Sequence, residues 1–523
     1  MNAFVQRHLP SVIGMLSGFD RLLFRGTLRR IASAAGLASF LSYTGVLLKE
    51  FGDYSNRLTK QIREASERVA EEAGRPVLYL PDPSVRKEDA AREIARRDRI
   101  ERGLVCVFSA VEPCWSFEIH RNAAAKKLEL KARQRRCLHH YHYLIHPQFG
   151  FMHMRIQTWL PFTVSVCVNG REWLSRQMDA AQLGYRRREN CFIDLENVEK
   201  AQALMDEQLK TRFGPMLNDI LAQASPGHAE LFGLDSGYPI DPYWSVQQSE
   251  WATDVMFKSP ALLAALYPRL IRQGMETLGS RDVLRFPGKN VPDGRNAHGN
   301  FKGQVLSDLK DRPEGLRVKH AVNGNSVKMY DKQGSVLRVE TTINQPGDFK
   351  VYRGTESEPK KKRWRRMRKG VADIHRRAQV SQKSNQRYLE AMAAVETSTP
   401  LKELAAPLCR PARRRGDRAR ALNPLSLPDA ALLEAVVRGE FTINGFRNRD
   451  VRRLLHGEDP ADRAESRRRS AATGRQLRLL RVHGLIRKVP RTHRYMVTDQ
   501  GRLVITALLA ARQANAAALA KAA

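Results

Sequence analysis

A histidine-rich stretch contains the first side chains that could do chemistry. It runs from Cys137 to His146 and reads CLHHYHYLIH. If residues 138–144 form a strand, His140 and His142 point to the same face, because side chains alternate along a strand. Two imidazoles at that spacing can hold one divalent cation, such as Mg²⁺ or Mn²⁺, that polarises a phosphodiester for attack. We therefore take His140 and His142 as candidate metal ligands.

A tyrosine further along the chain could supply a nucleophile. Tyr330 lies in the run Ser326–Lys332, and a second strand-like run extends to Glu340. Cations share its face of the expected sheet, so Tyr330 would lie where phosphates can bind. A tyrosine that attacks a metal-bound phosphate forms a covalent phosphotyrosine. A sheet that only grips backbone phosphates explains the same residues without any reaction.

These two groups resemble parts of a known nicking chemistry. The spacing of His140 and His142 resembles that of the HUH nickases of rolling-circle replication and of the relaxases. The run from Ser326 to Glu340 resembles a short segment of the replication initiators of plasmids and filamentous phages. The resemblance implies metal-dependent nicking of one DNA strand, with Tyr330 as the residue that forms the phosphotyrosine.

Two other groups of residues are further candidates. The carboxylates that could gather as ligands of a two-metal nuclease are Asp20, Glu112, Glu118 and Glu129. Nothing in their spacing requires a shared site, and surface acids are commoner. An aromatic group of Tyr243, Trp244 and Trp251 could stack on unpaired bases or fill a core.

The charge balance favours a polyanionic partner. The chain has 523 residues, with 89 Lys and Arg against 55 Asp and Glu, which leaves a formal charge of +34. A folded chain with 42% hydrophobic residues tolerates this repulsion mainly when DNA or RNA neutralises it. No apolar run approaches the ~18 residues that cross a membrane, so no membrane partner is expected. Motifs of NTPases, dinucleotide enzymes, serine hydrolases and zinc proteases are also absent.

The cysteines suggest no metal site. None of the six falls in a C-x-x-C pair, and a chain of this length needs no disulfide framework. Free thiols, together with a start that lacks the pattern of a signal peptide, are typical of a cytoplasmic protein.

The first 224 residues are predicted to form an α+β domain, with a helical part and an antiparallel sheet. Helical spacing covers residues 28–73, and an α/β alternation follows up to residue 108. From Trp115 to Val168, apolar and polar residues alternate as in an antiparallel sheet. Helices are then expected up to residue 224, and we place the N-terminal domain at residues 1–224.

Residues 225–400 are predicted to form a central domain with a β-meander and a basic helix. The expected strands are 316–322, 326–331 and 336–343, with turns at Asn323-Gly324 and Gln333-Gly334. One face of this meander is apolar and the other is basic. The basic residues expected to contact phosphates are Arg317, Lys319, Lys328 and Arg338, together with Arg363, Arg365 and Arg366 of the charged run before the helix.

A basic linker at residues 401–424 is expected to precede a C-terminal module at residues 425–523. Helices near residues 429–437, 449–455 and 461–482 lead to two short strands and a closing helix. Three helices, a β-hairpin and a last helix are the parts of a winged helix.

Arginines concentrate on the third helix and the hairpin of this module. A helix fits the major groove of DNA, and a basic hairpin can reach the neighbouring backbone. The residues expected to contact nucleic acid are Arg467, Arg468, Arg469, Arg475, Arg478, Arg481, Arg487, Lys488, Arg491 and Arg494. A solvated basic face that docks on the protein's own acids explains the same pattern, and winged helices also bind proteins or RNA.

The module resembles MarR-like winged-helix DNA-binding proteins. The matching residues are Leu479–Lys488 and Tyr495–Gly501, which resemble the end of the recognition helix, the wing and the start of the final helix. The resemblance covers about residues 425–520 and implies duplex DNA binding. MarR-like modules often act as dimers, but no dimerisation helix stands out, and we predict no oligomeric state.

Three short runs of residues carry a resemblance that extends over the whole chain. The runs Val111–Glu118, Gly170–Leu174 and Ser249–Asp254 are similar to a set of long, basic bacterial proteins without an assigned function. That set is associated with multicopy, mobile genes, so the resemblance implies a mobile-element setting and no activity.

The sequence therefore predicts a nucleic-acid-binding protein, with DNA as the favoured partner. A basic sheet would hold the phosphate backbone, and the winged helix would add duplex recognition. One alternative is a metal-dependent, Rep-like nickase that uses Tyr330 with His140 and His142. Another is a protein that binds structured RNA through shape and stacking.

Overall fold

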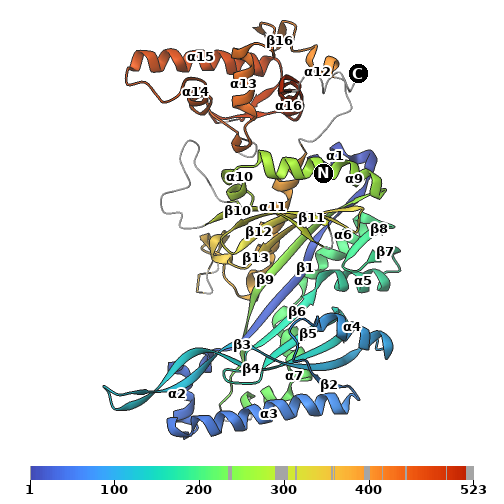
Figure 1. The fold of residues 1–523 in the computed structure, drawn as a ribbon, viewed down its shortest axis with the longest axis vertical. Coiled ribbons are helices and arrows are strands. Elements are labelled where there is room, and N and C mark those ends of the chain that lie inside the picture. Colours follow the sequence, from blue (N-terminus) through green and yellow to red (C-terminus); the bar gives the residue numbers. More distant parts are fainter. Residues whose placement is uncertain are drawn as a thin grey trace. The chain divides into compact units, whose positions relative to one another are not determined.

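The protein has an α+β fold, as the sequence predicts (Figure 1). The computed structural model describes residues 2–233, 238–288, 304–312, 315–354, 357–358, 360–393, 401–414, 416–441, 445–490 and 492–513. Within these ranges, no helix combines the length and the apolar composition that a membrane crossing needs.

Among the described residues, an 11-stranded sheet has the strand order β10-β11-β12-β13-β9-β1-β6-β5-β4-β3-β2. Its strands are β1 (Val12–Leu28), β2 (Val77–Tyr79), β3 (Gly103–Asn122), β4 (Lys127–His146), β5 (Gly150–Gln157), β6 (Val164–Asn169), β9 (Pro242–Phe257), β10 (Val305–Arg312), β11 (Gly315–Val322), β12 (Asn325–Lys332) and β13 (Val336–Ile343). The edge strand β2 runs parallel to β3.

The chain divides into two compact units, each made of segments far apart in the sequence. The first contains Met1–Met15, Asp254–Thr341 and Lys383–Ala523, and the second contains Leu16–Thr253 and Thr342–Gln382. The predicted boundaries at residues 224 and 400 do not coincide with these units, because β1 and β9 each contribute residues to both.

Helices of the second unit cover its strands. They are α2 (Ala34–Tyr43), α3 (Phe51–Glu72), α4 (Lys87–Arg97), α5 (Gly170–Ala180), α6 (Val198–Glu207), α7 (Phe213–Ala224) and α8 (Pro226–Phe232), with a small hairpin of β7 (Tyr185–Arg188) and β8 (Cys191–Leu195). Side chains of Ser33, Asn169 and Asn197 accept hydrogen bonds from the first turns of α2, α5 and α6. The apolar face of α4 packs on β3, where Ile94 joins Val105 in one core.

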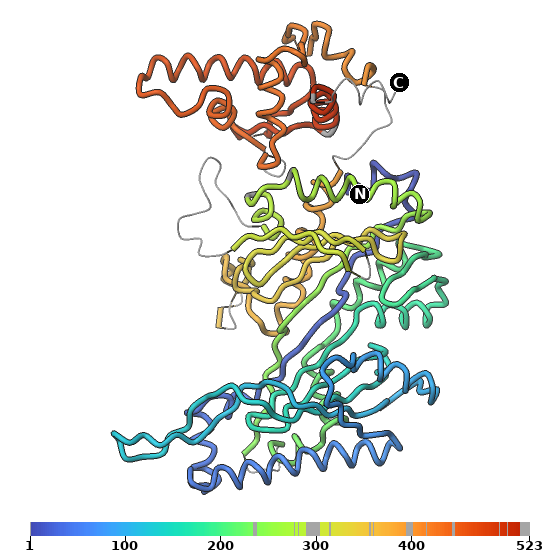
Figure 2. Tube along the Cα trace, viewed as in Figure 1, coloured from blue at the N-terminus to red at the C-terminus, as the bar shows by residue number. Residues whose placement is uncertain are grey.

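The predicted strands between residues 104 and 145 are parts of one long hairpin. β3 and β4 pair without interruption from Cys106 opposite Tyr143 to Asn122 opposite Lys127. Figure 2 shows the tip of this hairpin extending beyond the neighbouring strands.

Strands β1 and β9 were not predicted, because glycines and polar residues interrupt the apolar pattern of β1 and polar residues interrupt that of β9. A glycine is also needed where α5 begins beside β1. A Cβ at Gly170 would lie 1.8 Å from the carbonyl oxygen of Phe19. The close packing of α5 on β1 therefore depends on the missing side chain at Gly170.

The predicted meander is confirmed, and β10 adds an unpredicted edge strand. β11 and β12 pair with Val318 opposite Met329 and with Lys319 opposite Lys328. In the two turns, Asn323 has φ 55° and Gly334 has φ 78°, which a tight strand reversal requires.

Among the described residues, four helices lie wholly or partly in the first unit and precede its C-terminal module in the sequence. They are α1 (Ala3–Arg7), α9 (Pro260–Arg272), α10 (Ser280–Arg285) and α11 (Ile374–Met392). Leu266 of α9 and Leu389 of α11 belong to the same buried cluster as Val318, Met329 and Val339 of the meander.

The C-terminal module contains the predicted elements in the predicted order. They are α13 (Leu427–Val437), α14 (Asn448–His456), α15 (Arg463–Val482), β18 (Ile486–Lys488), β19 (Tyr495–Val497) and α16 (Asp499–Gln513). Leu433, Leu480 and Ile486 form their common core. Arg447 occupies the N-cap position of α14.

Residues 401–424 do not form the predicted linker. They contain α12 (Leu401–Ala405) and a small hairpin of β16 (Ala412–Arg414) and β17 (Asp417–Ala419). Leu408 and Leu422 are buried in the core of the C-terminal module. The basic composition of the segment conceals these two apolar anchors, which make it part of the module.

Candidate functional site

One turn of α15 gathers arginines around a single carboxylate. Glu465 accepts hydrogen bonds from Arg468 at 2.7 Å and from Arg469 at 2.8 Å. These bonds lower the pKa of Glu465 to about 2, so its carboxylate stays ionised near neutral pH. Arg467 is exposed beside them, and the described residues offer it no ion pair. Arg467, Arg468 and Arg469 together carry three positive charges against the one negative charge of Glu465, so this turn is positively charged.

The last turns of α15 contact the β16–β17 hairpin. Asp417 accepts hydrogen bonds from Arg478 at 2.8 Å and from Arg481 at 2.9 Å. The two guanidiniums, predicted as contacts to nucleic acid, are therefore turned toward their own module. Arg475 is exposed.

The β18–β19 hairpin presents further cations. Arg487 and Lys488 are exposed on β18, and Arg494 is half-buried just before β19. Arg491, also predicted as a contact, lies outside the described residues.

A cationic cavity lies where α14, α15 and this hairpin meet. Its volume is about 280 Å³, and its lining residues are Arg447, Asn448, Arg449, Arg452, Ser470, Lys488, His493 and Tyr495. The lining set contains no carboxylate. Lys488 alone was among the predicted contacts, although the run Arg447 to Arg453, with four arginines in seven residues, was a usable signal.

Hydrogen bonds fix the walls of the cavity. The amide of Asn448 donates to the carbonyl oxygen of Ser470 at 3.0 Å, and the Ser470 hydroxyl donates to the Asn448 side-chain oxygen at 3.2 Å. Arg452 donates to Asp459 at 2.8 Å. The first turn of α14 is thus held against the middle of α15. This contact keeps the cationic side chains that line the cavity close to one another.

The meander has a cationic face of its own. Lys319 and Lys328 lie directly opposite each other on β11 and β12, and Arg317 lies opposite Tyr330. Burial lowers the pKa of Lys319, Asp308 raises it, and the neighbouring cations lower it further. Like charges in opposite positions repel, and the carboxylates of Asp308 and Glu340 partly offset this repulsion.

Tyr330 lies beside a buried carboxylate on this face. Its hydroxyl donates to Glu340 at 2.8 Å, and the ammonium of Lys328 lies 2.7 Å from the same carboxylate. Burial alone would raise the pKa of Glu340, but Lys328 and other cations outweigh it and lower the pKa. Glu340 is therefore an ionised hydrogen-bond acceptor for the hydroxyl of Tyr330.

Arg338 does not lie on the exposed basic face that the sequence predicts. All residues of β13 are buried, since β13 has a strand on either side and packing on both faces. Its guanidinium donates to Asp254 at 2.6 and 2.9 Å. Arg338 is thus a buried ion-pair partner and cannot reach a phosphate backbone.

The predicted metal ligands His140 and His142 lie on β4 with their ring centroids 6.4 Å apart. Both are buried, and burial lowers the pKa of His140 to about 4 and that of His142 to about 3. No third potential ligand joins them among the described residues. The sheet order also places β13, β9, β1, β6 and β5 between β4 and the strand of Tyr330. The structure therefore does not bring the two predicted parts of a nickase together.

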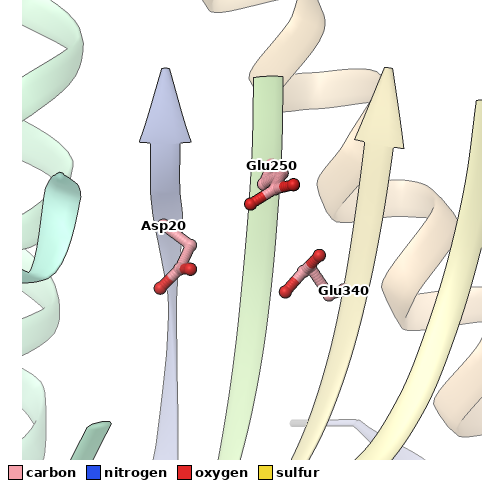
Figure 3. Close-up of side chains that lie close together, drawn as sticks. All are labelled: Asp20, Glu250 and Glu340. Atoms are coloured by element: carbon pink, nitrogen blue, oxygen red, sulfur yellow. The ribbon is translucent and has the colours of Figure 1, made fainter. Parts of the chain in front are cut away.

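Three carboxylates do come together. Asp20 on β1, Glu250 on β9 and Glu340 on β13 each offer an oxygen, and these oxygens all lie within 4.8 Å of one another (Figure 3). All three side chains are buried. Of these, only Asp20 was among the acids considered from the sequence as metal ligands.

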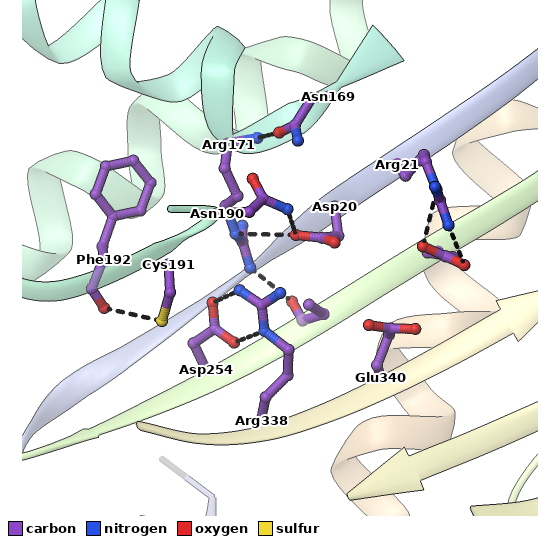
Figure 4. Close-up of polar contacts among 12 residues, drawn as sticks. Asp20, Arg21, Asn169, Arg171, Asn190, Cys191, Phe192, Asp254, Arg338 and Glu340 are labelled. Atoms are coloured by element: carbon purple, nitrogen blue, oxygen red, sulfur yellow. Dashed lines mark hydrogen bonds and ion pairs between the residues drawn. The ribbon is translucent and has the colours of Figure 1, made fainter. Parts of the chain in front are cut away.

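Cations and amides surround these carboxylates. Arg21 donates to Glu250 at 3.2 Å, and Asn190 donates to Asp20 at 2.8 Å. Arg171, which is fully buried, has its Nε 3.8 Å from Asp20 (Figure 4). Asp20 and Glu250 therefore each have a donor or a cation within reach.

The other acids and aromatics considered from the sequence have separate structural partners. Glu112 accepts from Tyr141, Glu118 from Arg133, and Glu129 from Asn122, each in its own ion pair or hydrogen bond. Trp244 and Trp251 are buried, so they fill the core and do not stack on bases.

The remaining predicted contacts lie on a two-stranded hairpin of β14 (Lys350–Arg353) and β15 (Arg363–Arg366). Arg363 and Arg366 are exposed there and Arg365 is half-buried, and alternation places Arg363 and Arg365 on one face and Arg366 on the other. The three predicted arginines therefore do not form one surface.

Comparison with known proteins gives no relative for this chain. No known family, no curated protein and no solved structure matches it.

Proposed function

We propose that this chain is a nucleic-acid-binding protein, and that its C-terminal module is a winged helix that binds duplex DNA. The observation that carries the proposal is the cavity lined by Arg449, Arg452 and Lys488 without any carboxylate. A phosphate is the anion that such a set of donors prefers in a basic protein, because guanidinium groups match its geometry.

The order of elements supports a winged helix. Helices α13, α14 and α15 precede the β18–β19 hairpin and α16, and the three helices share a core with the hairpin. In that arrangement α15 would enter the major groove with Arg467, while the hairpin with Arg487 would reach the adjacent backbone. The cavity lies between α15 and the hairpin, and it would hold a phosphate of the DNA strand that runs between these two contacts.

A test compares affinities for a duplex at one salt concentration. Arg449→Ala and Lys488→Ala each remove one cation from the cavity, and each should weaken binding about tenfold, since a charge-assisted hydrogen bond contributes ~1.5 kcal/mol. Lys49→Ala removes an exposed cation of the other unit and should leave the affinity unchanged. Equal effects of all three variants would refute a defined site.

Structured RNA remains the second polymer to test with the same variants. An A-form helix has a deep, narrow major groove that side chains cannot read. The proposal therefore predicts that the wild-type protein binds the DNA duplex more tightly than an RNA duplex of the same sequence. The reverse order would favour the RNA-binding alternative.

A second candidate function is a metal-dependent DNA nickase, and the hydrogen bond from Tyr330 to Glu340 favours it. The Tyr330 oxygen would attack phosphorus while its proton passes to Glu340. The 3′-oxygen would leave, take a proton from water and become a free hydroxyl, with the 5′-phosphate bonded to the tyrosine. Mg²⁺ or Mn²⁺ would polarise the phosphodiester, and carboxylate oxygens are the ligands that both ions prefer.

Supercoiled plasmid with Mn²⁺ tests this candidate. It predicts nicking by the wild-type protein and none by Tyr330→Phe. Tyr185→Phe is a matched control, because the Tyr185 hydroxyl donates to Asp179 at 2.9 Å in a comparable pair. Absence of nicking by the wild type, or equal nicking by Tyr330→Phe, ends the enzymatic candidate and leaves the binding function in place.

A further inference from the structure

The β14–β15 hairpin displays two aromatic rings toward solvent. Tyr352 lies directly opposite Trp364, and Lys350 lies directly opposite Arg366. Opposite residues share a face, and alternation puts both pairs on the same face. Tyr352 is 56% exposed and Trp364 is 69% exposed. This face therefore consists of two accessible rings and two cations.

The opposite face of the hairpin anchors it. Val351 is buried in one cluster with Ile343, Phe349 and Met367. Arg353 is buried too, and its guanidinium donates to the carbonyl oxygen of Arg366 at 3.3 Å. Because the inner face is fixed in this way, the two rings cannot turn inward without breaking the cluster.

The rings touch each other but leave their surfaces available. Their centroids lie 5.7 Å apart with an angle of 56° between the ring planes. This is a tilted contact rather than a closed stack, so a flat ligand can lie against either ring. Exposed aromatic pairs cost solvation free energy, and a ligand that stacks on them recovers it.

The charge around the rings selects the kind of ligand. Eight of the ten residues 360–369 are Lys or Arg. Within this run, the ammonium of Lys361 forms an ion pair with Glu358 at 3.1 Å. A ligand with flat apolar surfaces and a regular negative charge complements such a face, and unpaired nucleotides have both.

We propose that this face binds single-stranded nucleic acid, with bases stacked on Trp364 and Tyr352 and phosphates held by Lys350 and Arg366. The inference rests on the proposed nucleic-acid binding and adds a second, strand-specific site to it. Duplex bases stack on one another and hide their faces, so a duplex cannot use the rings. Stacking tolerates every base, and the site should show little sequence preference.

Fluorescence anisotropy with the full-length protein tests this site. The probes are a labelled 20-nucleotide single strand, as DNA and as RNA, and the matching DNA duplex. The variant Tyr352→Ala with Trp364→Ala should weaken single-strand binding about tenfold or more and change duplex binding by less than about twofold. Trp364→Phe keeps a ring and should restore most of the single-strand affinity. Equal losses for DNA and RNA strands are expected, because both offer bases and phosphates.

The control is Trp115→Ala, which removes another exposed ring, 63% exposed, from the β3–β4 hairpin. It should leave single-strand binding unchanged. Unchanged single-strand binding by the double variant, or an equal loss on the duplex, would overturn the inference. If duplex binding still depends on Arg449 and Lys488 in that case, the proposed function stands without this site. If the wild-type protein binds neither probe, both proposals fail. A poly-glutamate peptide that competes as well as the single strand would assign the face to acidic proteins instead.

Discussion

Asn448 and Ser470 exchange two hydrogen bonds, 3.0 and 3.2 Å long, between the first turn of α14 and the middle of α15. This pair sets the distance between the two helices that line the cationic cavity. The side chains that surround it come from three separate elements, so a small shift of α14 would separate Arg449 from Lys488. The position of the phosphate site thus depends on two neutral side chains.

Replacing Asn448 with Ala should therefore weaken DNA binding without removing a charge. The variant loses both hydrogen bonds, and we expect the free energy of unfolding of the module to fall by about 1–2 kcal/mol. Duplex affinity should fall severalfold, as α14 loses its fixed place. Urea unfolding and anisotropy measure the two effects, and unchanged affinity would contradict this role.

Because Arg338 forms a buried ion pair, its replacement should lower the free energy of unfolding strongly and have no direct effect on DNA binding. Arg338→Ala removes the cation of a fully buried ion pair with Asp254, so the free energy of unfolding should fall by about 3–5 kcal/mol. The control is Arg186→Ala, whose pair with Asp194 is exposed and should contribute at most about 1 kcal/mol. Chemical denaturation distinguishes the two, and similar small effects would show that Arg338 is not needed for folding.

The buried histidines predict a loss of stability in acid. In the folded chain the pKa of His140 is lowered to about 4 and that of His142 to about 3, while an unfolded chain titrates near ~6.5. Below pH ~6.5 the unfolded chain takes up protons that the folded chain refuses, so the free energy of unfolding should fall as the pH drops toward ~4.

A variant isolates this contribution. His142→Phe keeps a ring of similar shape but cannot be protonated, so its stability should fall less between pH 7 and pH 5 than that of the wild type. His120 is exposed, and His120→Phe should leave the pH dependence as it is. Urea midpoints at the two pH values are the measurement, and parallel changes in all three proteins would rule out this role for His142.

The close approach of α5 to β1 gives a backbone prediction. Gly170→Ala places a Cβ 1.8 Å from the carbonyl oxygen of Phe19, and rigid backbone must shift to admit it. We expect a loss of about 1–3 kcal/mol. Gly214 in α7 has no atom within 4 Å of the same position, so Gly214→Ala should be neutral or stabilise by up to about 1 kcal/mol. Thermal unfolding of the two variants compares them, and equal melting temperatures would contradict the packing described.

The local elements could be predicted where the sequence alternates or repeats with one period. β11, β12 and β13 alternate regularly between turn residues such as Asn323 and Gly334, and the helices of the C-terminal module have clear apolar stripes. β1 and β9 lack such a pattern, because parts of each strand are buried on both faces. Glycines and polar residues also interrupt β1, and polar residues interrupt β9. The linker prediction failed because Leu408 and Leu422 are isolated apolar residues in a basic segment.

The candidate sites were predictable only in part. The charges of α15 and of the hairpin are visible in the sequence, but the sequence does not show that Asp417 and Glu465 share several of them. Asp20, Glu250 and Glu340 come from distant positions, and only the strand order brings them together. Pairing of Tyr352 with Trp364 likewise depends on a register that the composition does not reveal.

The salt dependence of duplex binding tests the central claim most directly. Each phosphate that the protein neutralises releases counterions, so the logarithm of the binding constant should fall linearly with the logarithm of the salt concentration between ~50 and ~300 mM. We predict a slope of about −4 or steeper for the wild-type protein, reduced in size by about 2 in Arg449→Ala with Lys488→Ala. A binding constant that stays flat over this range would contradict the account.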